Sequence, residues 1–108
     1  MTELWNYRVV ECRVVDGDTL DVTLDLGFHT LRKERLRLAR INAPEMKTPQ
    51  GPVSKTRLAE MLAGKFVIVK TQKDKTDKYG RFIAEVFVDE TNVNDALVAG
   101  GFAAFQSY

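Results

Sequence analysis

The chain has 108 residues, enough for one domain, and its 44% hydrophobic and 29% charged residues argue against a disordered protein. No apolar run approaches the roughly 18 residues that a membrane crossing needs. The N-terminal residues also lack the basic start and apolar core of a signal peptide. These features favour a single cytoplasmic domain over residues 1–108, although a secreted chain that had lost its signal would look the same.

The net charge of +1 conceals an uneven distribution along the chain. Residues 29–81 carry 14 Lys and Arg against 5 Asp and Glu, an excess of +9, whereas the two flanks together carry an excess of −8. A basic middle between acidic ends predicts one positive surface that suits a polyanion. Segments that interleave in space would instead give a balanced surface, and the charges alone do not decide between the two.

Three strands are predicted in the first 41 residues. The first covers residues 7–15 and ends at a tight turn, and the second covers residues 19–26, where apolar and polar side chains alternate with period two. After Gly27, residues 30–41 form the third strand of a meander. Cys12, the only cysteine, falls in the apolar pattern of the first strand and is interpreted as a packing residue, which excludes an internal disulfide.

The rest of the chain predicts two helices and two further strands. A helix of about a dozen residues begins at 49–52 and ends at Gly64, and strands follow over 66–70 and 82–88 with a charged loop between them. A short second helix covers 92–98, with Asn92 as its cap. The order predicts a mainly β fold with α (α+β), a five-stranded Greek-key barrel of the OB type with the main helix at one end. The pattern does not fix the strand order.

The first chemical motif is the Asp16-Gly17-Asp18-Thr19 turn. Asp18 is in phase with the inward residues of the second strand, and a carboxylate on the core side of a barrel mouth is costly unless a cation or donors satisfy it. Asp18 is therefore a candidate metal ligand. The alternative is an ordinary hairpin turn, where Asp is common, and the motif alone favours that alternative.

The second motif joins Arg37 to Glu45. Arg37 is predicted to project out of the core, on the face opposite the leucines of its strand. Pro44 ends the strand and holds Ala43 extended, which fixes the direction of Glu45. A rigid turn that aims a carboxylate close to an arginine and an aspartate is what metal-assisted attack by water needs. Taken alone, Arg37 would be a surface residue and Glu45 a residue that leads into the helix.

The third motif is the charged loop over residues 73–81. Lys78 and Arg81 can hold phosphates, and Tyr79 can stack on a base or donate its hydroxyl. The alternative is a solvated loop. His29 is the only histidine, which argues against zinc and against Ser-His-Asp chemistry, so an oxygen-ligated hard cation is the natural candidate.

In this order and spacing, the three motifs resemble the staphylococcal nuclease family, the thermonucleases, and the similarity extends over about residues 9–105. The resemblance implies an OB-fold barrel and calcium-dependent hydrolysis of DNA and RNA, without sugar specificity and leaving a 3′-phosphate. It also implies roles for eight residues: Arg37, Glu45 and Arg81 in catalysis; Asp18, the Asn42 side chain and the Ala43 carbonyl as ligands of Ca²⁺; Lys78 and Tyr79 as contacts to the nucleic acid.

The chain departs from the family pattern at three places. Asn42 stands where the family has a second ligating aspartate, so it keeps the oxygen and loses the charge. The family type continues into a third helix beyond the position of Tyr108, and without it residues 102–105 would be an uncovered apolar tail that favours self-association or lower stability. Of the family's pair of tyrosines at the nucleotide, Tyr108 supplies one at most.

The sequence therefore predicts a calcium-dependent nuclease with a sequence-independent DNA or RNA substrate. The alternative is a non-catalytic nucleic-acid-binding OB module, and a third reading is a protein-interaction adaptor. Family members without catalysis tend to lose the two arginines and the glutamate, whereas Arg37, Glu45 and Arg81 are all present in this chain. An adaptor would not need a pair of phosphate-clamping arginines.

Overall fold

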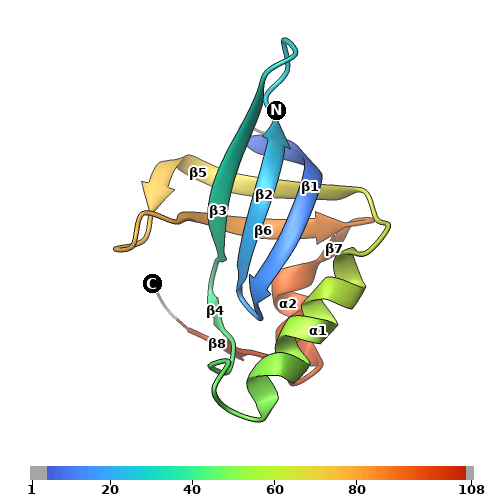
Figure 1. The fold of residues 1–108 in the computed structure, drawn as a ribbon, viewed down its shortest axis with the longest axis vertical. Helices are drawn as coiled ribbons and strands as arrows, with labels where there is room; N and C mark the ends of the chain where they lie inside the picture. Colours follow the sequence, from blue (N-terminus) through green and yellow to red (C-terminus); the bar gives the residue numbers. More distant parts are fainter. Residues whose placement is uncertain (1–4, 107–108) are drawn as a thin grey trace.

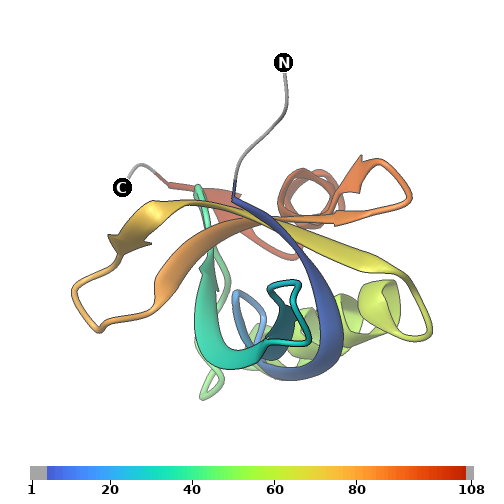
Figure 2. The same cartoon turned by 90° about the horizontal axis from the view of Figure 1, so that it is seen from above.

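A closed β-barrel forms the centre of the protein in a computed structural model that describes residues 5–106, apart from the side chains of residues 73–75 (Figures 1 and 2). The barrel strands are β1 (Asn6–Asp16), β2 (Thr19–Asp25), β3 (Leu31–Leu38), β5 (Val67–Thr76) and β6 (Phe82–Val88). They follow one another in the order β3-β2-β1-β5-β6, and a parallel pairing of β3 with β6 closes the ring, while the other neighbours are antiparallel. This arrangement confirms the predicted OB-type barrel and supplies the strand order.

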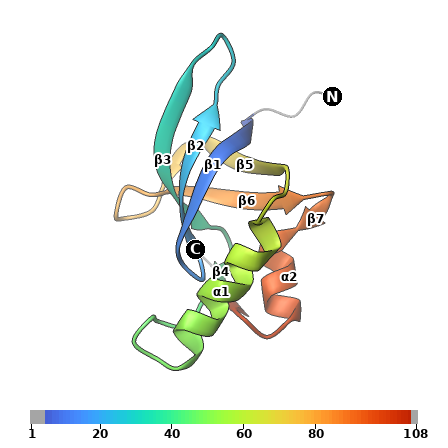
Figure 3. The ribbon, with the colours of Figure 1, turned by 45° about the vertical axis from the view of Figure 1, so that its right-hand side comes forward.

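Two helices and three short strands complete the described part of the chain: β4 (Ile41–Asn42), α1 (Gln50–Leu62), β7 (Thr91–Asn92), α2 (Val93–Ala99) and β8 (Ala104–Phe105). Helix α1 lies across one end of the barrel, with α2 beside it (Figure 3). The Asn92 side chain accepts a hydrogen bond from the Asp95 amide, which confirms the predicted cap of α2. Within residues 5–106, no helix has the length and apolar character that crossing a membrane requires.

The core follows from the period-two pattern of the strands. Leu20, Val22 and Leu24 of β2 point into the barrel, as the alternation predicts, and Leu58 of α1 closes its end. Each fully buried leucine contributes about 2 kcal/mol through the apolar surface that it removes from water. The helix and the strands are therefore held together by one shared core.

The third strand is shorter than predicted, because the chain leaves the barrel after Leu38. Arg40 adopts a left-handed conformation with φ of 67°, and its guanidinium binds Glu85 and Asp95. The buried Asn94 side chain donates to the Ala39 carbonyl. These contacts turn the chain out of the sheet, and β4 then carries it toward the β1–β2 turn.

Three further predictions are corrected by the structure. Strand β5 extends to Thr76, well beyond the predicted end at Lys70, because a bulge lets it resume pairing with β6. Cys12 is exposed, because β1 pairs with β5 only as far as Val9 and its second half has an open edge. The prediction that residues 102–105 form an uncovered apolar tail is wrong for Phe102. Its ring packs against the core, and its carbonyl accepts a hydrogen bond from the Ser54 hydroxyl at 2.6 Å. Ala103 also packs against the core, whereas Phe105 is exposed.

Candidate active site

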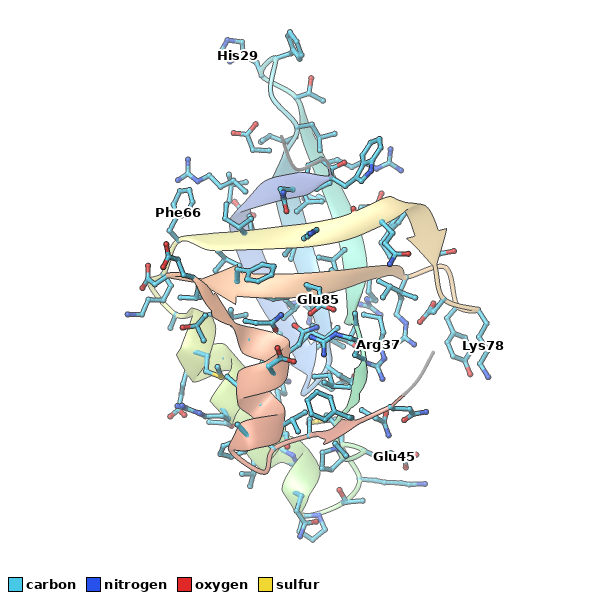
Figure 4. All side chains as sticks on the ribbon, turned by 180° about the vertical axis from the view of Figure 1, so that it is seen from behind. His29, Arg37, Glu45, Phe66, Lys78 and Glu85 are labelled. Carbon is cyan, nitrogen blue, oxygen red and sulfur yellow. The ribbon has the colours of Figure 1, made fainter. Side chains whose placement is uncertain are left out.

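A cleft of about 810 Å³ opens on the side of the barrel where the β1–β2 turn, the end of β3, β4 and the β5–β6 loop meet. All eight residues singled out from the sequence line it: Asp18, Arg37, Asn42, Ala43, Glu45, Lys78, Tyr79 and Arg81. Figure 4 shows Arg37, Glu45 and Lys78 on the same side of the molecule, although they come from three separate segments. Tyr108, named from the family pattern, lies outside the described residues.

Asp18 lies at the floor of the cleft, and close packing puts it there. A Cβ atom at Gly17 would lie 2.7 Å from the Ala43 Cβ and 2.8 Å from the Ser54 Cβ, so the absence of a side chain lets the β1–β2 turn press against β4 and α1. One Asp18 carboxylate oxygen accepts from the Ala43 amide at 2.8 Å, and the other from the Thr19 hydroxyl. Burial raises the pKa of Asp18, which a bound cation would reverse.

Asp16 is a site residue that the sequence analysis treated only as part of a turn. It accepts a hydrogen bond from the Asp18 amide at 3.1 Å, and the two carboxyl groups influence each other's pKa. Burial alone would raise the pKa of Asp16, but the hydrogen bonds with Asp18 and Thr19 and the charge of Arg37 outweigh it, so the pKa is lowered. The two carboxyls therefore titrate as a pair, with Asp16 the more acidic. The sequence could have indicated Asp16, because it lies two residues before Asp18 at the end of a strand.

Arg37 does not project into solvent, as the sequence analysis predicted, but is 6% exposed. Arg37 does lie on the face of β3 opposite Leu36 and Leu38, as predicted. At this end of the strand, however, the β1–β2 turn and β4 cover that face. One Arg37 nitrogen donates to the Leu38 carbonyl at 2.8 Å, and another lies 3.3 Å from both an Asp18 carboxylate oxygen and the Asn42 side-chain oxygen. A planar guanidinium held on several sides is preorganised for a phosphate at the open side of the cleft.

Glu45 has a fixed backbone and an open side chain. Its carbonyl accepts from both the amide and the hydroxyl of Thr48, and a Cβ atom at Gly51 of α1 would lie only 2.2 Å from that carbonyl oxygen. The Glu45 side chain is 71% exposed at the rim of the cleft, with Lys47 at 3.2 Å. The Pro44 turn is therefore clamped by the start of α1, and the carboxylate is accessible to water.

Asp77 is the second site residue that the sequence analysis missed, and it organises the β5–β6 loop. One carboxylate oxygen accepts from the amides of Tyr79 and Arg81, and the other binds the Arg81 guanidinium at 2.6 and 2.7 Å. Burial alone would raise the pKa of Asp77, but these hydrogen bonds outweigh it and lower the pKa. Arg81 also donates to the Thr19 hydroxyl at 3.3 Å, which links the loop to β2.

Tyr79 stands at the outer edge of this loop with its ring exposed. The Lys78 ammonium and the Arg81 guanidinium each lie 5.2 Å from the centre of the ring. An exposed aromatic ring with two cations near it combines stacking and charge, and contacts to nucleotides use both.

The donors around Asp18 suit a hard cation. Asp16, Asp18, Asn42 and Ala43 line the same cleft, and calcium prefers carboxylate, amide and carbonyl oxygens of the kinds that these residues carry. No cluster of three or more His, Cys, Asp or Glu side chains at ligating positions occurs among the described residues. A metal here would therefore depend on amide, carbonyl and water oxygens as well as carboxylates, which the cleft can supply.

The chain is similar to proteins of one known family. The family model described as "Staphylococcal nuclease homologue" matches residues 35–108. An "Uncharacterized endonuclease" of Escherichia coli O157:H7 is 38% identical over 97 residues, covering 89% of this chain and 58% of that protein. "Endonuclease YncB" of Bacillus subtilis (strain 168) is 32% identical over 98 residues, covering 84% and 44%. The "Probable staphylococcal-like nuclease CAN2" of Oryza sativa subsp. japonica is 32% identical over 103 residues, covering 94% and 24%. The chain thus spans less than two thirds of each of these relatives.

Proposed function

The chain belongs to the staphylococcal nuclease family, and on this basis we propose that it is a calcium-dependent nuclease that hydrolyses phosphodiester bonds in DNA and RNA. The observation that carries the proposal is the convergence of Arg37, Arg81, Glu45 and the Asp16–Asp18 pair on one cleft. Two fixed guanidinium groups, an accessible carboxylate and a set of oxygen donors are the parts that phosphodiester hydrolysis needs.

The two arginines bind and orient the phosphate. Asp18 and Asn42 hold Arg37, and Asp77 with Thr19 holds Arg81, so both guanidinium groups keep their direction before substrate arrives. Donors that need no reorganisation stabilise the charge that develops on the phosphate oxygens, and losing one typically costs about 10²- to 10³-fold in rate.

Glu45 is proposed to orient the attacking water and to accept its proton. The water oxygen bonds to phosphorus, the bond from phosphorus to the 5′ oxygen breaks, and the leaving oxygen takes a proton from solvent, which leaves a 3′-phosphate. The exposed position of the carboxylate at the rim supports this role, because water reaches it freely.

Asp18, with Asp16, the Asn42 side chain and the Ala43 carbonyl, is proposed to hold the calcium ion. When bound, calcium would supply positive charge beside the scissile phosphate. Lys78 and Tyr79 are proposed to hold the neighbouring nucleotide. Contacts to phosphate and to the faces of bases carry little sequence information, which supports a sequence-independent substrate.

Cleavage of labelled single-stranded DNA tests the proposal, with Ca²⁺, with EDTA, and with Glu45→Ala as the matched variant. We expect cleavage only with Ca²⁺, and a rate at least about 10²-fold lower for the variant. If the protein binds the oligonucleotide but cleaves it at no calcium concentration, the non-catalytic OB module is the better description.

A further inference from the structure

A row of cations continues from the cleft along the outer face of β3. Lys33, Arg35 and Arg37 are alternate residues of the strand, so they share one face. Same-face residues of a strand are about 6.5–6.8 Å apart, which is close to the separation of successive phosphates in an extended polynucleotide. In Figure 4 the strand leads from Arg37 toward the hairpin that carries His29.

This row borders a groove of about 510 Å³ over the outer face of β1, β2 and β3. Lys33 lies opposite Thr23 and Arg35 opposite Asp21 in the antiparallel pairing of β2 with β3. At the other edge of β3, the parallel register pairs Leu36 with Phe82 and Arg37 with Ile83. The groove and the proposed catalytic cleft share no lining residue, and β3 links them, because Arg35 of the groove and Arg37 of the cleft are two residues apart on one face.

The charges that line the groove balance overall, with Arg13, Lys33 and Arg35 against Glu11, Asp21 and Glu34. The positive row is therefore confined to one face of β3, and the anion paired with it is Asp21. Asp21 accepts from Arg35 at 2.7 and 2.9 Å and from Arg13 at 2.6 Å, so this group of three keeps one positive charge. The Arg13 side chain is largely exposed and that of Arg35 about half exposed, and exposed ion pairs contribute little, so a phosphate can compete for either guanidinium. Lys33 adds a second exposed positive charge.

We propose that a single-stranded polynucleotide binds along the outer face of β3, with Arg35 and Lys33 holding the two phosphates that follow the one at Arg37 and Arg81. The proposal rests on the proposed nuclease function for that first phosphate. A single strand is the occupant because Arg37 lies almost fully buried at the bottom of the cleft, where a flexible strand reaches more easily than a base-paired one.

The test measures fluorescence anisotropy of labelled oligothymidylates of three and eight nucleotides, in EDTA and at several salt concentrations. Lys33→Gln/Arg35→Gln is compared with Lys55→Gln/Lys65→Gln, a matched loss of two charges in the separate groove between β1 and α1. We expect the first variant to bind the eight-nucleotide strand about tenfold more weakly, with a log–log salt slope about 1.4 smaller in magnitude, two phosphates at about 0.7 each. The control and the trinucleotide should change less than about twofold.

An equal loss in the control variant would show that only the overall charge matters, and an equal loss with the trinucleotide would place the two residues in the cleft itself. An equal loss with an eight-base-pair duplex would exclude the single-strand assignment. Each of these results overturns the proposal. Cleavage of the trinucleotide by the same variants is measured in parallel with calcium: its absence in every variant defeats the proposed nuclease function, while the binding comparison still decides the path along β3.

Discussion

Burial divides the charged residues of the cleft into two kinds. Arg37 is nearly inaccessible and pairs with the buried Asp18, whereas the Glu45 side chain is largely exposed. We expect Arg37→Ala to lower turnover by at least about 10²-fold and the free energy of unfolding by about 3 kcal/mol, because it leaves a buried carboxylate without its cation. Glu45→Ala should lower turnover and leave the free energy of unfolding unchanged. Oligonucleotide cleavage and urea unfolding of both variants measure this, and equal stability losses would contradict it.

Asn42 is expected to weaken calcium binding relative to a carboxylate at the same position. Its side-chain oxygen accepts from Arg37, so the residue already faces the charged part of the cleft. Calcium affinity follows the charge of its ligands, although desolvating another carboxylate offsets much of the gain. We predict that Asn42→Asp lowers the calcium concentration for half-maximal cleavage by about tenfold, or 1.4 kcal/mol. Calcium titrations of activity at one pH and salt compare the two proteins, and identical midpoints would remove Asn42 from the ligand set.

Asp77 links the stability of the β5–β6 loop to pH. Its pKa lies below the ordinary value of 3.8, so the folded state favours the ionised form. The resulting stability is present above pH 3.8 and is lost as the pH falls through the lower pKa of the folded state. We expect Asp77→Asn to destabilise the protein by about 1–2 kcal/mol at pH 7 and by progressively less below pH 4. Urea unfolding between pH 7 and pH 3 measures the difference, and a constant difference would contradict the assigned ion pair with Arg81.

At the scale of elements, the helix and most strands could be predicted because their signals are local. The alternation over residues 19–26 and the apolar spacing of the main helix predict these elements without knowledge of what they pack against. The end of β3 at Leu38 could not be predicted, because it depends on Asn94 and on the ion pairs of Arg40 with residues far along the chain. The extension of β5 to Thr76 likewise depends on pairing with β6.

The difference between local signals and long-range contacts also explains which site residues could be predicted from the sequence. Arg37 and Glu45 lie in a motif whose Pro turn constrains its own geometry, so they could be assigned from the sequence. Asp16 and Asp77 have the appearance of ordinary turn aspartates, and their contacts with Asp18 and Arg81 exist only once the loops are folded.

Contact between α1 and the Pro44 turn yields a prediction for an element that carries no catalytic group. A Cβ atom at Gly51 would lie 2.2 Å from the Glu45 carbonyl oxygen and 2.6 Å from the Met46 Cα. We expect Gly51→Ala to displace the turn, to cost about 1–3 kcal/mol of stability and to lower turnover about tenfold or more. Cleavage and unfolding are measured for this variant and for Gly64→Ala, whose Cβ would meet nothing within 4 Å. Because Gly64 has a left-handed φ of 67°, alanine should lower stability there too, but its effect on turnover should be small. Unchanged turnover in Gly51→Ala would mean that the helix does not hold Glu45 in place.

Across the whole molecule, the uneven charge of the sequence is partly balanced in space. Acidic residues of the two flanks bind cations of the basic middle: Asp18 binds Arg37, Asp21 binds Arg35, and Glu85 and Asp95 bind Arg40. The excess of +9 over residues 29–81 therefore overstates the charge that a polyanion meets. Of the two arrangements that the sequence left open, the interleaved one describes these pairs. The cleft follows the same rule, because Arg37, Lys78 and Arg81 line it together with Asp16, Asp18, Glu45 and Asp77.

Salt dependence of binding measures how much of that charge remains. If the whole excess of +9 neutralised phosphates on a single strand, the slope of log affinity against log salt would be about −6. We predict a slope of about −2 to −3, equivalent to three or four phosphates, because internal ion pairs already occupy many of the cations. Affinities for oligothymidylate, oligoadenylate and a mixed strand should agree within a few-fold, since phosphate contacts do not read bases. A slope near −6 would mean that the internal pairs open on binding, and a strong preference for one sequence would indicate that base edges, not phosphates, are recognised.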